Sequence, residues 1–319
     1  MGYYNLHHSL GQLLWLNHAI YPFHRRDHCY IDTLRLSLRL EPLQKGTFMP
    51  ELPEVEVARR RIAPHAVGRI IQKLIVRNYD LRWPVPDEIQ AELPGQTVLK
   101  LDRRGKYLVF RCSEGNMILH FGMNGNLHRV SAAATPGKHD HLDIVFTDGV
   151  CLRFTDPRRF GSVLWTRNDP ISHRLLKGMG PEPLTDDFNG EYLFQRSRGR
   201  RITVKQFIMN SAIVSGLGNI YAAEAMFHAG IHPATEAGAI SAAGYNRLAA
   251  AIREVLVSAI DQGMNAACTN PSGKGDPGYF PVLFFVYGRA GEPCRQCGTS
   301  IQKVRQAGRS TWFCPNCQK

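Results

Sequence analysis

The chain lacks the features that would place it in a membrane or direct it out of the cell. No stretch approaches the ~18–20 consecutive apolar residues that a membrane-spanning helix needs. Residues 10–20 are only weakly apolar and no basic segment precedes them, so they do not resemble a signal peptide. The sequence therefore predicts a protein that neither spans a membrane nor is secreted.

Acidic residues are also scarce relative to basic ones. Asp and Glu number 27 against 39 Lys and Arg, which gives a net charge of +12 and a pI near 9.5. Such an excess favours an anionic partner, with nucleic acid first and a membrane surface second. The remaining composition, 44% hydrophobic and 21% charged, is that of a globular protein, and 319 residues suffice for two or three domains.

Cysteine occurs in two patterns. Four of the eight cysteines are scattered singly, and the others form two Cys-x2-Cys pairs at the end of the chain: Cys294, Cys297, Cys314 and Cys317. Without a secretory signal, paired spacing argues for a metal site instead of disulfides. Four thiolates give the closed tetrahedral site of structural zinc, which leaves no ligand position for catalysis. The alternative is four free or disulfide-linked cysteines.

Residues 1–48 differ from the rest of the chain. They are rich in His, Tyr and Leu and show no sustained periodicity. An amphipathic transit peptide is disfavoured because the segment contains Asp27, Asp32 and Glu41. We expect residues 1–48 to be an extension, either a mis-assigned start or a removed segment, that is not part of the working protein.

Residues 67–165 contain short alternating runs that predict strands at 97–101, 107–112, 117–121, 142–146 and 150–154. The sequence Thr-Asp-Gly at 147–149 is typical of a hairpin. Arg153 alternates with apolar neighbours, which predicts one buried and one solvated face. Short strands at this spacing favour an antiparallel sandwich or barrel. Residues 131–138 predict a loop.

The pattern becomes helical after a Gly-Pro-Glu-Pro sequence at 180–183. We expect helices at 203–211 and 220–229, the second ended by Gly230. Ser241 can cap a longer helix whose apolar residues recur every four positions and which ends at Gly263. Residues 269–281 are rich in Gly and Pro and predict a loop.

The segment 49–56, with the sequence MPELPEVE, predicts a helix start and offers a nucleophile. Pro53 suits a first helical turn because its missing N–H has no partner to lose there, and Glu54 and Glu56 favour the positive end of the helix dipole. If translation starts at Met49 and this residue is removed, Pro50 becomes a free secondary amine. A terminal amine of pKa ~7.7–8.0 is roughly 10–20% neutral at pH 7, against under ~0.1% for a lysine, and is therefore the better nucleophile.

Three further motifs each allow a functional and a structural interpretation. The glycine-flanked helix start at 216–221 can bind a phosphate through free N–H groups, or can be purely structural. The turn at 156–161 can grip a DNA backbone and wedge bases apart, or can be a solvated turn with Phe160 packed inward. The segment 103–107 is either a charged strand start or presents Lys106 to a site.

Seven segments in one order resemble the bacterial formamidopyrimidine-DNA glycosylase family: PELPEVE at 50–56, RRGKY at 103–107, HFGM at 120–123, KHDH at 138–141, TDPRRFG at 155–161, GLGNIYAAE at 216–224 and the four-cysteine end. The resemblance covers residues 49–319. Leu52 favours this branch over the related endonuclease VIII branch, whose N-terminal motif, PEGPE, contains a glycine. The implied fold is α+β and multidomain: an N-terminal antiparallel β-sandwich with a leading helix (49–180), a helix–two-turns–helix domain (181–290) and a C-terminal four-cysteine zinc finger hairpin (291–319).

The resemblance implies a bifunctional DNA glycosylase and abasic-site lyase of base-excision repair that removes oxidised purines such as 8-oxoguanine and formamidopyrimidines. In this family the N-terminal proline, here Pro50, forms a Schiff base with C1′ of the damaged nucleotide. Glu51 matches the family's acid/base residue. Lys106 matches the proton donor linked to β-elimination, and Arg309 the one linked to δ-elimination.

The resemblance also implies the partner and the cofactor. The partner is double-stranded DNA with a damaged purine, which must leave the duplex to be reached. Three positions match residues that fill the vacated space: Met123, Arg158 and Phe160. Four match residues that contact DNA, mostly its backbone: His139, Arg158, Arg200 and Asn219. We expect one structural Zn²⁺, no redox or nucleotide cofactor, and a monomer that has no membrane partner and is cytoplasmic and nucleoid-associated in a bacterium.

Two features leave alternatives open. If residues 1–48 are retained, the Pro50 nitrogen is an amide, and we then expect a non-catalytic zinc-ribbon nucleic-acid-binding protein with Lys303 and Arg305 available for phosphates. Residues 264–272 depart from the threonine-rich segment that the family has before the loop over the flipped base. The lesion preference therefore stays open, whereas the catalytic residues lie elsewhere.

Overall fold

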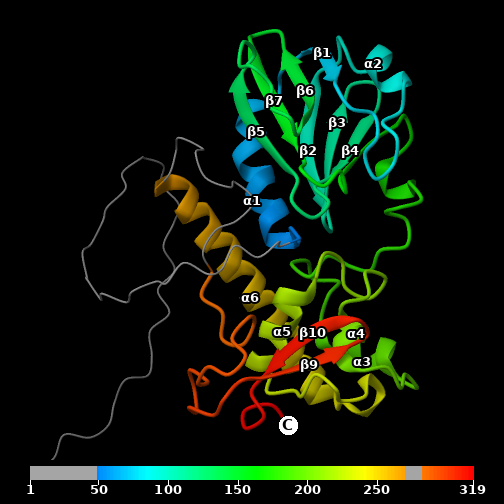
Figure 1. The fold of residues 1–319 in the computed structure, drawn as a ribbon. Helices are drawn as coiled ribbons and strands as arrows, with labels where there is room; N and C mark the ends of the chain where they lie inside the picture. Colours follow the sequence, from blue (N-terminus) through cyan, green and yellow to red (C-terminus); the bar gives the residue numbers. More distant parts are fainter. Residues whose placement is uncertain (1–48, 270–281) are drawn as a thin grey trace, which may run out of the picture. The chain divides into compact units, whose positions relative to one another are not determined.

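The computed structural model describes residues 49–269 and 282–319 (Figure 1). The predictions for residues 1–48, and for all but the first residue of the expected loop 269–281, lie outside these ranges. The described part comprises a leading helix, two antiparallel sheets, a group of helices and a C-terminal hairpin, which is the expected α+β arrangement. None of the helices in the described ranges combines the length and the apolar character needed to cross a membrane.

Two four-stranded antiparallel sheets form the sandwich in the described residues. The first has the order β1-β6-β7-β5, with the bounds Ile71–Val76, Asp140–Phe146, Val150–Thr155 and Asn126–Ser131. The second has the order β2-β3-β4-β8, with the bounds Val98–Arg104, Tyr107–Cys112, Asn116–His120 and Ser162–Thr166. The predicted strands are confirmed. Three strands of the sandwich were not predicted: β1, β5 and β8. In β1 and β5, polar residues interrupt the apolar positions.

Arg153 on β7 corrects one prediction. We expected its side chain on a solvated face, but Arg153 is only 3% exposed. Its guanidinium donates to both carboxylate oxygens of Asp143 on β6, at 2.8 and 2.9 Å, and Arg77 also contacts this carboxylate. Buried charges need such partners. The alternation of Arg153 with apolar residues along β7 therefore reflects a buried ion pair with the neighbouring strand and not a solvent-exposed face.

Helix α1 (Leu52–Ile62) belongs to two hydrophobic cores. It has a proline in its first turn, as predicted. Leu52 and Val57 pack into the core of the helices, while Val55 and Ala58 pack into the core of the sandwich. The side chains of α1 therefore connect the two parts of the described chain.

The second core is built by α3 (Gly190–Ser197), α4 (Val204–Ile208), α5 (Asn219–His228) and α6 (Ala242–Thr269). Ser241 begins α6 as predicted, because its Oγ accepts a hydrogen bond from the backbone N–H of Gly244 at 3.1 Å. The predicted end at Gly263 was wrong, and α6 continues to Thr269. An interior glycine costs a helix only about 1 kcal/mol relative to alanine, which the packing of α6 outweighs.

Shorter elements complete the fold. Helix α2 (Glu88–Glu92) and the 3-10 turns η1 (Ala63–His65), η2 (Pro170–Ser172) and η3 (Ala237–Ala239) lie between the larger elements. Strands β9 (Gln302–Gln306) and β10 (Arg309–Phe313) form the C-terminal hairpin. A small apolar cluster joins this end of the chain to α5: Ala223, Phe227, Val286, Cys294, Ile301 and Cys314.

Candidate active site

Glu51 is buried at a junction between the starts of α1 and α5. It is 3% exposed, and its carboxylate accepts hydrogen bonds from the backbone N–H groups of Ile220 at 3.0 Å and Tyr221 at 3.5 Å. The backbone N–H of Leu52 donates to the carbonyl of Gly216 at 3.2 Å. The helix start for which phosphate binding was one of two interpretations therefore holds the protein's own carboxylate, next to the buried Pro50.

Gly218 explains the glycines before α5. A Cβ at this position would lie 2.2 Å from the Glu51 carboxyl group, far inside van der Waals contact. Gly216 has φ +78°, and a Cβ there would lie 2.9 Å from Leu52. Only glycines therefore allow the loop to approach the start of α1 this closely.

Glu54 lies one turn into α1, behind Glu51. The hydroxyl of Tyr221 donates to Glu54 Oε1 at 2.6 Å, and the backbone N–H of Glu51 donates to Oε2 at 2.9 Å. Burial, with a smaller contribution from the charge of Glu51, raises the pKa of Glu54 to about 7. We expected Glu54 to be a charge that favours the helix dipole, but its burial favours the protonated form. The site thus contains a second, titrating carboxyl group.

Lys106 follows a turn that Glu182 holds in place. The carboxylate of Glu182 accepts hydrogen bonds from the backbone N–H of Gly105 at 2.7 Å and from the guanidinium of Arg104 at 3.0 Å. Arg103 also contacts Glu182 and donates to Glu56 of α1 at 3.1 Å. Arg103 therefore links the strand that leads into the Lys106 turn to helix α1, which begins two residues after the nucleophile candidate Pro50.

A cavity of about 220 Å³ joins residues of four separate segments. It is lined by Met49, Arg82, His120, Gly122, Met123 and Phe160. Burial, followed by the positive charges of Lys106 and Arg82, lowers the pKa of His120 to about 4, so its ring is neutral at pH 7. The cavity therefore brings two of the predicted void-filling residues together beside the residue that precedes Pro50.

Sequence reasoning assigned no role to Arg82 or His120. His120 begins the motif HFGM, and its place directly before Phe121-Gly122-Met123 is the signal that could have identified it. Arg82 stands in no motif that we recognised. Its backbone N–H donates to the carbonyl of Gly161 at 3.0 Å, a contact across 79 positions that a single sequence does not reveal.

The turn at 156–161 is exposed, as expected, and its aromatic residue is not packed inward. Phe160 is 42% exposed, and the guanidinium of Arg158 lies 4.8 Å from the centre of its ring. The buried carboxylate of Asp156 accepts hydrogen bonds from the backbone N–H groups of Gly161 at 2.7 Å and Arg158 at 3.2 Å. Asp156 therefore fixes a turn that presents a cation and an aromatic ring to solvent.

The remaining predicted DNA-contacting residues are more dispersed. The carbonyl of His139 accepts from the backbone N–H of Asp156 at 2.9 Å, which places His139 beside that turn. The Oδ1 atom of Asn219, in the first turn of α5, is buried and has no hydrogen-bond partner within the described ranges. Arg200 lies over the ring of Phe207, at 5.7 Å, and contacts none of the other candidates.

Lys205 links the C-terminal hairpin to the helices. Its ammonium group is buried and donates to the carbonyl of Ser310 at 2.9 Å and to Thr311 Oγ1 at 2.6 Å. Burial, followed by the charge of Arg309, lowers the pKa of Lys205 to about 8, and the charge of Glu51 opposes this shift. Lys205 therefore lies within electrostatic range of both Arg309 and Glu51, although Arg309 itself is exposed and does not contact Glu51.

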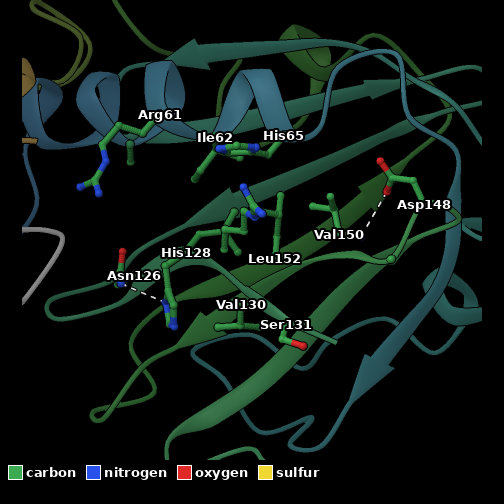
Figure 2. Close-up of a pocket in the computed structure, with 14 residues that line it drawn as sticks. Arg61, Ile62, His65, Asn126, His128, Val130, Ser131, Asp148, Val150 and Leu152 are labelled. Atoms are coloured by element: carbon green, nitrogen blue, oxygen red, sulfur yellow. Dashed lines mark hydrogen bonds between the residues drawn. The ribbon is translucent and has the colours of Figure 1, made fainter. Parts of the chain in front are cut away.

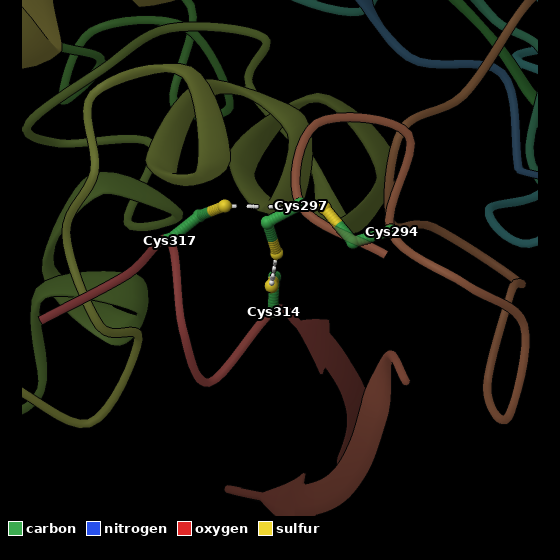
Figure 3. Close-up of side chains that lie close together, drawn as sticks. All are labelled: Cys294, Cys297, Cys314 and Cys317. Atoms are coloured by element: carbon green, nitrogen blue, oxygen red, sulfur yellow. Dashed lines mark hydrogen bonds between the residues drawn. The ribbon is translucent and has the colours of Figure 1, made fainter. Parts of the chain in front are cut away.

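The four C-terminal cysteines converge on one point (Figure 3). All four Sγ atoms lie within 4.8 Å of one another, with Cys294 and Cys317 at 3.9 Å and Cys297 and Cys314 at 3.5 Å. A tetrahedral zinc site with Zn–S bonds of about 2.3 Å places its sulfurs about 3.8 Å apart. The residues present therefore fit a structural zinc ion.

Three family models match consecutive parts of the chain. The formamidopyrimidine-DNA glycosylase N-terminal domain matches residues 49–163, and the H2TH domain of the same family matches residues 179–270. The zinc finger found in FPG and IleRS matches residues 291–319. These matches cover the sandwich, the helices and the cysteine cluster.

Curated relatives extend the similarity over whole proteins. Formamidopyrimidine-DNA glycosylase from Geotalea uraniireducens is 54% identical over 270 residues, which are 85% of this chain and 100% of the relative. The enzyme of the same name from Pseudomonas entomophila is 51% identical over 271 residues, with the same coverage of both chains.

Solved structures agree. Lactococcus lactis Fpg in complex with DNA containing an abasic site is 33% identical with a TM-score of 0.76, and the match covers 84% of this chain and 99% of that one. MutM in complex with DNA containing carbocyclic 8-oxo-G is also 33% identical with a TM-score of 0.76, over 85% and 100% of the two chains. On the agreement of sequence, fold and site, this chain belongs to the formamidopyrimidine-DNA glycosylase family of DNA-repair enzymes.

Proposed function

We propose that this chain excises oxidised purines, 8-oxoguanine and formamidopyrimidines, from double-stranded DNA and then cleaves the strand on both sides of the abasic sugar. The observation that carries the proposal is the burial of Glu51 between Pro50 and the start of α5. Family membership supports it, because similar solved structures are complexes with DNA that contains an abasic site, FAPY-dG or carbocyclic 8-oxo-G.

Pro50 is the proposed nucleophile. As a free N-terminal amine, its nitrogen attacks C1′ of the damaged nucleotide, and the base leaves with the electron pair of its bond to C1′ while the amine loses its proton. The bond from C1′ to the ring oxygen O4′ then breaks, O4′ takes up a proton, and C1′ and the nitrogen form the Schiff base. A preceding peptide bond removes the lone pair from this role. We therefore propose that the working enzyme begins at Pro50, and that residues 1–48 and Met49 are absent from it.

Glu51 is the proposed acid/base residue. The backbone N–H groups of Ile220 and Tyr221 hold its carboxyl group in a fixed position beside Pro50, so it can donate a proton to the opening sugar and later accept one. Glu54, with a pKa raised to about 7, accepts a hydrogen bond from the backbone N–H of Glu51.

Lys106 and Arg309 are the proposed proton donors for the two elimination steps. Lys106 is partly buried on the turn held by Glu182, close enough to His120 to lower the pKa of that ring. Arg309 begins β10 on the zinc hairpin and acts through its charge on the buried Lys205. In this assignment Lys106 serves β-elimination and Arg309 serves δ-elimination.

The exposed cationic and aromatic residues are the proposed DNA contacts. Met123, Arg158 and Phe160 occupy the space left by the extruded base, with Arg158 facing the unpaired partner base. His139, Arg200 and Asn219 contact the DNA backbone, where the side-chain amide N–H groups of Asn219 are the donors that suit a phosphate. The protein acts as a monomer.

Three domains carry out these roles in the proposal. Residues 49–180 form the catalytic sandwich, 181–290 the DNA-binding helices and 291–319 the zinc finger. The cysteines Cys294, Cys297, Cys314 and Cys317 hold one Zn²⁺, whose chemical contribution is to keep the hairpin folded.

The proposal is tested by incubating the Pro50–Lys319 protein with a duplex that contains 8-oxoguanine and analysing both the released base and the cut strand. Base release with phosphate at both new ends is the expected result. Glu51→Gln keeps the shape of the side chain and should reduce both steps. Duplex binding with no base release from well-folded protein would instead favour a non-catalytic binding protein.

A further inference from the structure

A second cavity, of about 770 Å³, lies between the end of α1 and strand β5 (Figure 2). The helix and the turn that follows it contribute Ala58, Arg61, Ile62 and His65, which are spaced to share one face. Strand β5 contributes all of its residues, 126–131. The cavity shares no residue with the proposed catalytic or DNA-contacting set.

The cavity runs along the edge of β5 and also extends over the face that Arg129 and Ser131 share with Leu152 and Val150 of β7. Successive side chains of a strand point to opposite faces, so a cavity on one face touches every second residue. This cavity touches six consecutive residues. It therefore lies beside the backbone of the strand.

The backbone groups on that edge are available for pairing. Strand β5 is the last strand of the sheet β1-β6-β7-β5, and β7 is its partner. Within residues 49–269 and 282–319, no other element forms a hydrogen bond with the backbone of residues 126–130. An uncovered row of N–H and C=O groups on an edge strand is a template for a further strand.

The lining of the groove is positively charged. Arg61 and Arg129 form no ion pair with any described residue. The acid among the lining residues, Asp148, is already paired with Arg69 at 2.6 Å. Burial, followed by the charges of Arg129 and Arg69, lowers the pKa of His65, which indicates a positive potential at this end of the groove. An occupant with acidic groups is therefore favoured.

We propose that the groove between α1 and β5 binds an extended acidic peptide of a partner protein, which adds a fifth strand to the sheet at β5. Alternating N–H and C=O groups match a peptide backbone, whereas DNA offers only acceptors along its phosphates. Main-chain hydrogen bonds give such complexes their affinity, and alternate side chains give specificity. Acidic side chains of the peptide lie toward Arg61 and Arg129. The volume is in the range of pockets that enclose a ligand, about 300–1,000 Å³.

The test begins with a selection on the protein saturated with an undamaged duplex, so that its DNA-binding surface is occupied. A library of random peptides of about ten residues, the upper length of common strands, is selected for binding. Recovered peptides are synthesised with a fluorescent label, and their Kd is measured by fluorescence anisotropy. We expect acidic peptides that protect the amides of β5 from hydrogen exchange.

Charge-reversal variants of the protein and N-methylated peptides test the two parts of the proposed interaction, the charge and the backbone pairing. Arg61→Glu combined with Arg129→Glu should weaken binding at least about tenfold, since like charges then oppose one another. Lys73→Glu is the matched control, because Lys73 is an exposed cation on β1, the opposite edge of the same sheet. N-methylation of alternate peptide amides should weaken binding when it blocks the N–H groups that face β5.

Several outcomes would overturn the proposal. The first is that the selection does not enrich acidic peptides. The second is that N-methylation of either alternate set of peptide amides leaves binding unchanged. The third is that the double charge reversal leaves binding unchanged. Binding of a DNA oligonucleotide to the groove in place of peptides would assign it to nucleic acid and also overturn the proposal. Base excision should persist in the double variant, so this test fails or succeeds independently of the proposed catalytic function.

Discussion

The carboxylate of Glu51 accepts a hydrogen bond from the backbone N–H of Ile220 at 3.0 Å, across 169 positions of sequence. One residue begins α1 next to Pro50, and the other lies in the first turn of α5. The proposed acid/base residue is therefore held by the helical part of the chain and not by the sandwich that follows it. In the proposed mechanism, the position of this carboxylate consequently depends on the loop that precedes α5.

Gly218→Ala tests this dependence. The added Cβ would lie 2.2 Å from the Glu51 carboxyl group, so the carboxyl group or the loop must move. We expect the rate of base release to fall at least about tenfold, which corresponds to about 1.4 kcal/mol of transition-state stabilisation. Single-turnover kinetics measure the effect. Gly178→Ala is the control, because a Cβ there meets no atom within 4 Å, and an equal loss in both variants would contradict the account.

Glu54→Gln tests the raised pKa of the second carboxyl group. Burial raises this pKa from 4.5 to about 7, so the folded protein binds the proton more tightly than the unfolded chain does. The resulting stabilisation is fully present below pH 4.5 and is lost as the pH rises through about 7. Urea unfolding between these limits should show the free energy of unfolding declining with pH less steeply in Glu54→Gln than in the parent. Parallel pH profiles would show that Glu54 does not titrate in this window.

Arg153→Leu tests the buried ion pair between β6 and β7. The substitution leaves the carboxylate of Asp143 with Arg77 as its remaining cation, and uncompensated buried charges cost about 3–5 kcal/mol. Because Arg77 still pairs with Asp143, we expect the free energy of unfolding to fall by about 3 kcal/mol. Lys100→Ala removes an exposed pair with Asp102 and should cost at most about 1 kcal/mol. Equal losses in chemical denaturation would contradict the assignment.

Zinc removal tests the role of the cysteine cluster. A chelator should unfold the hairpin, which removes the acceptors of the buried Lys205 and displaces Arg309. We expect δ-elimination and DNA binding to weaken strongly. The near-ultraviolet circular dichroism of the sandwich should change little by comparison. Cys297→Ser should reproduce the effect without chelator. Full δ-elimination by metal-free protein would separate Arg309 from that step.

The sequence revealed those parts of the site that are encoded locally. Pro50, Glu51, the Lys106 turn and the paired cysteines each stand in a short motif with a recognisable spacing. The fold followed from alternation and capping signals, such as Ser241 before α6. These features need only neighbouring residues, which a single sequence displays.

The parts that escaped prediction depend on residues far apart in the chain. Glu182 holds the Lys106 turn from 77 positions away, and nothing around Glu182 marks this contact. Arg153 resembled a solvated residue because its partner Asp143 lies on another strand. Cavities, including the groove beside β5, arise only when helices and strands pack, and so they have no local sequence signal.

The central claim is that the nitrogen of Pro50 forms the covalent bond to DNA. Protein that begins at Pro50 is mixed with an 8-oxoguanine duplex and borohydride, and mass spectrometry of the digested adduct locates the attached sugar. The account predicts attachment to the N-terminal peptide at Pro50, and none in matched protein that retains Met49. Attachment to Lys106, or an equal yield in the protein that retains Met49, would contradict it.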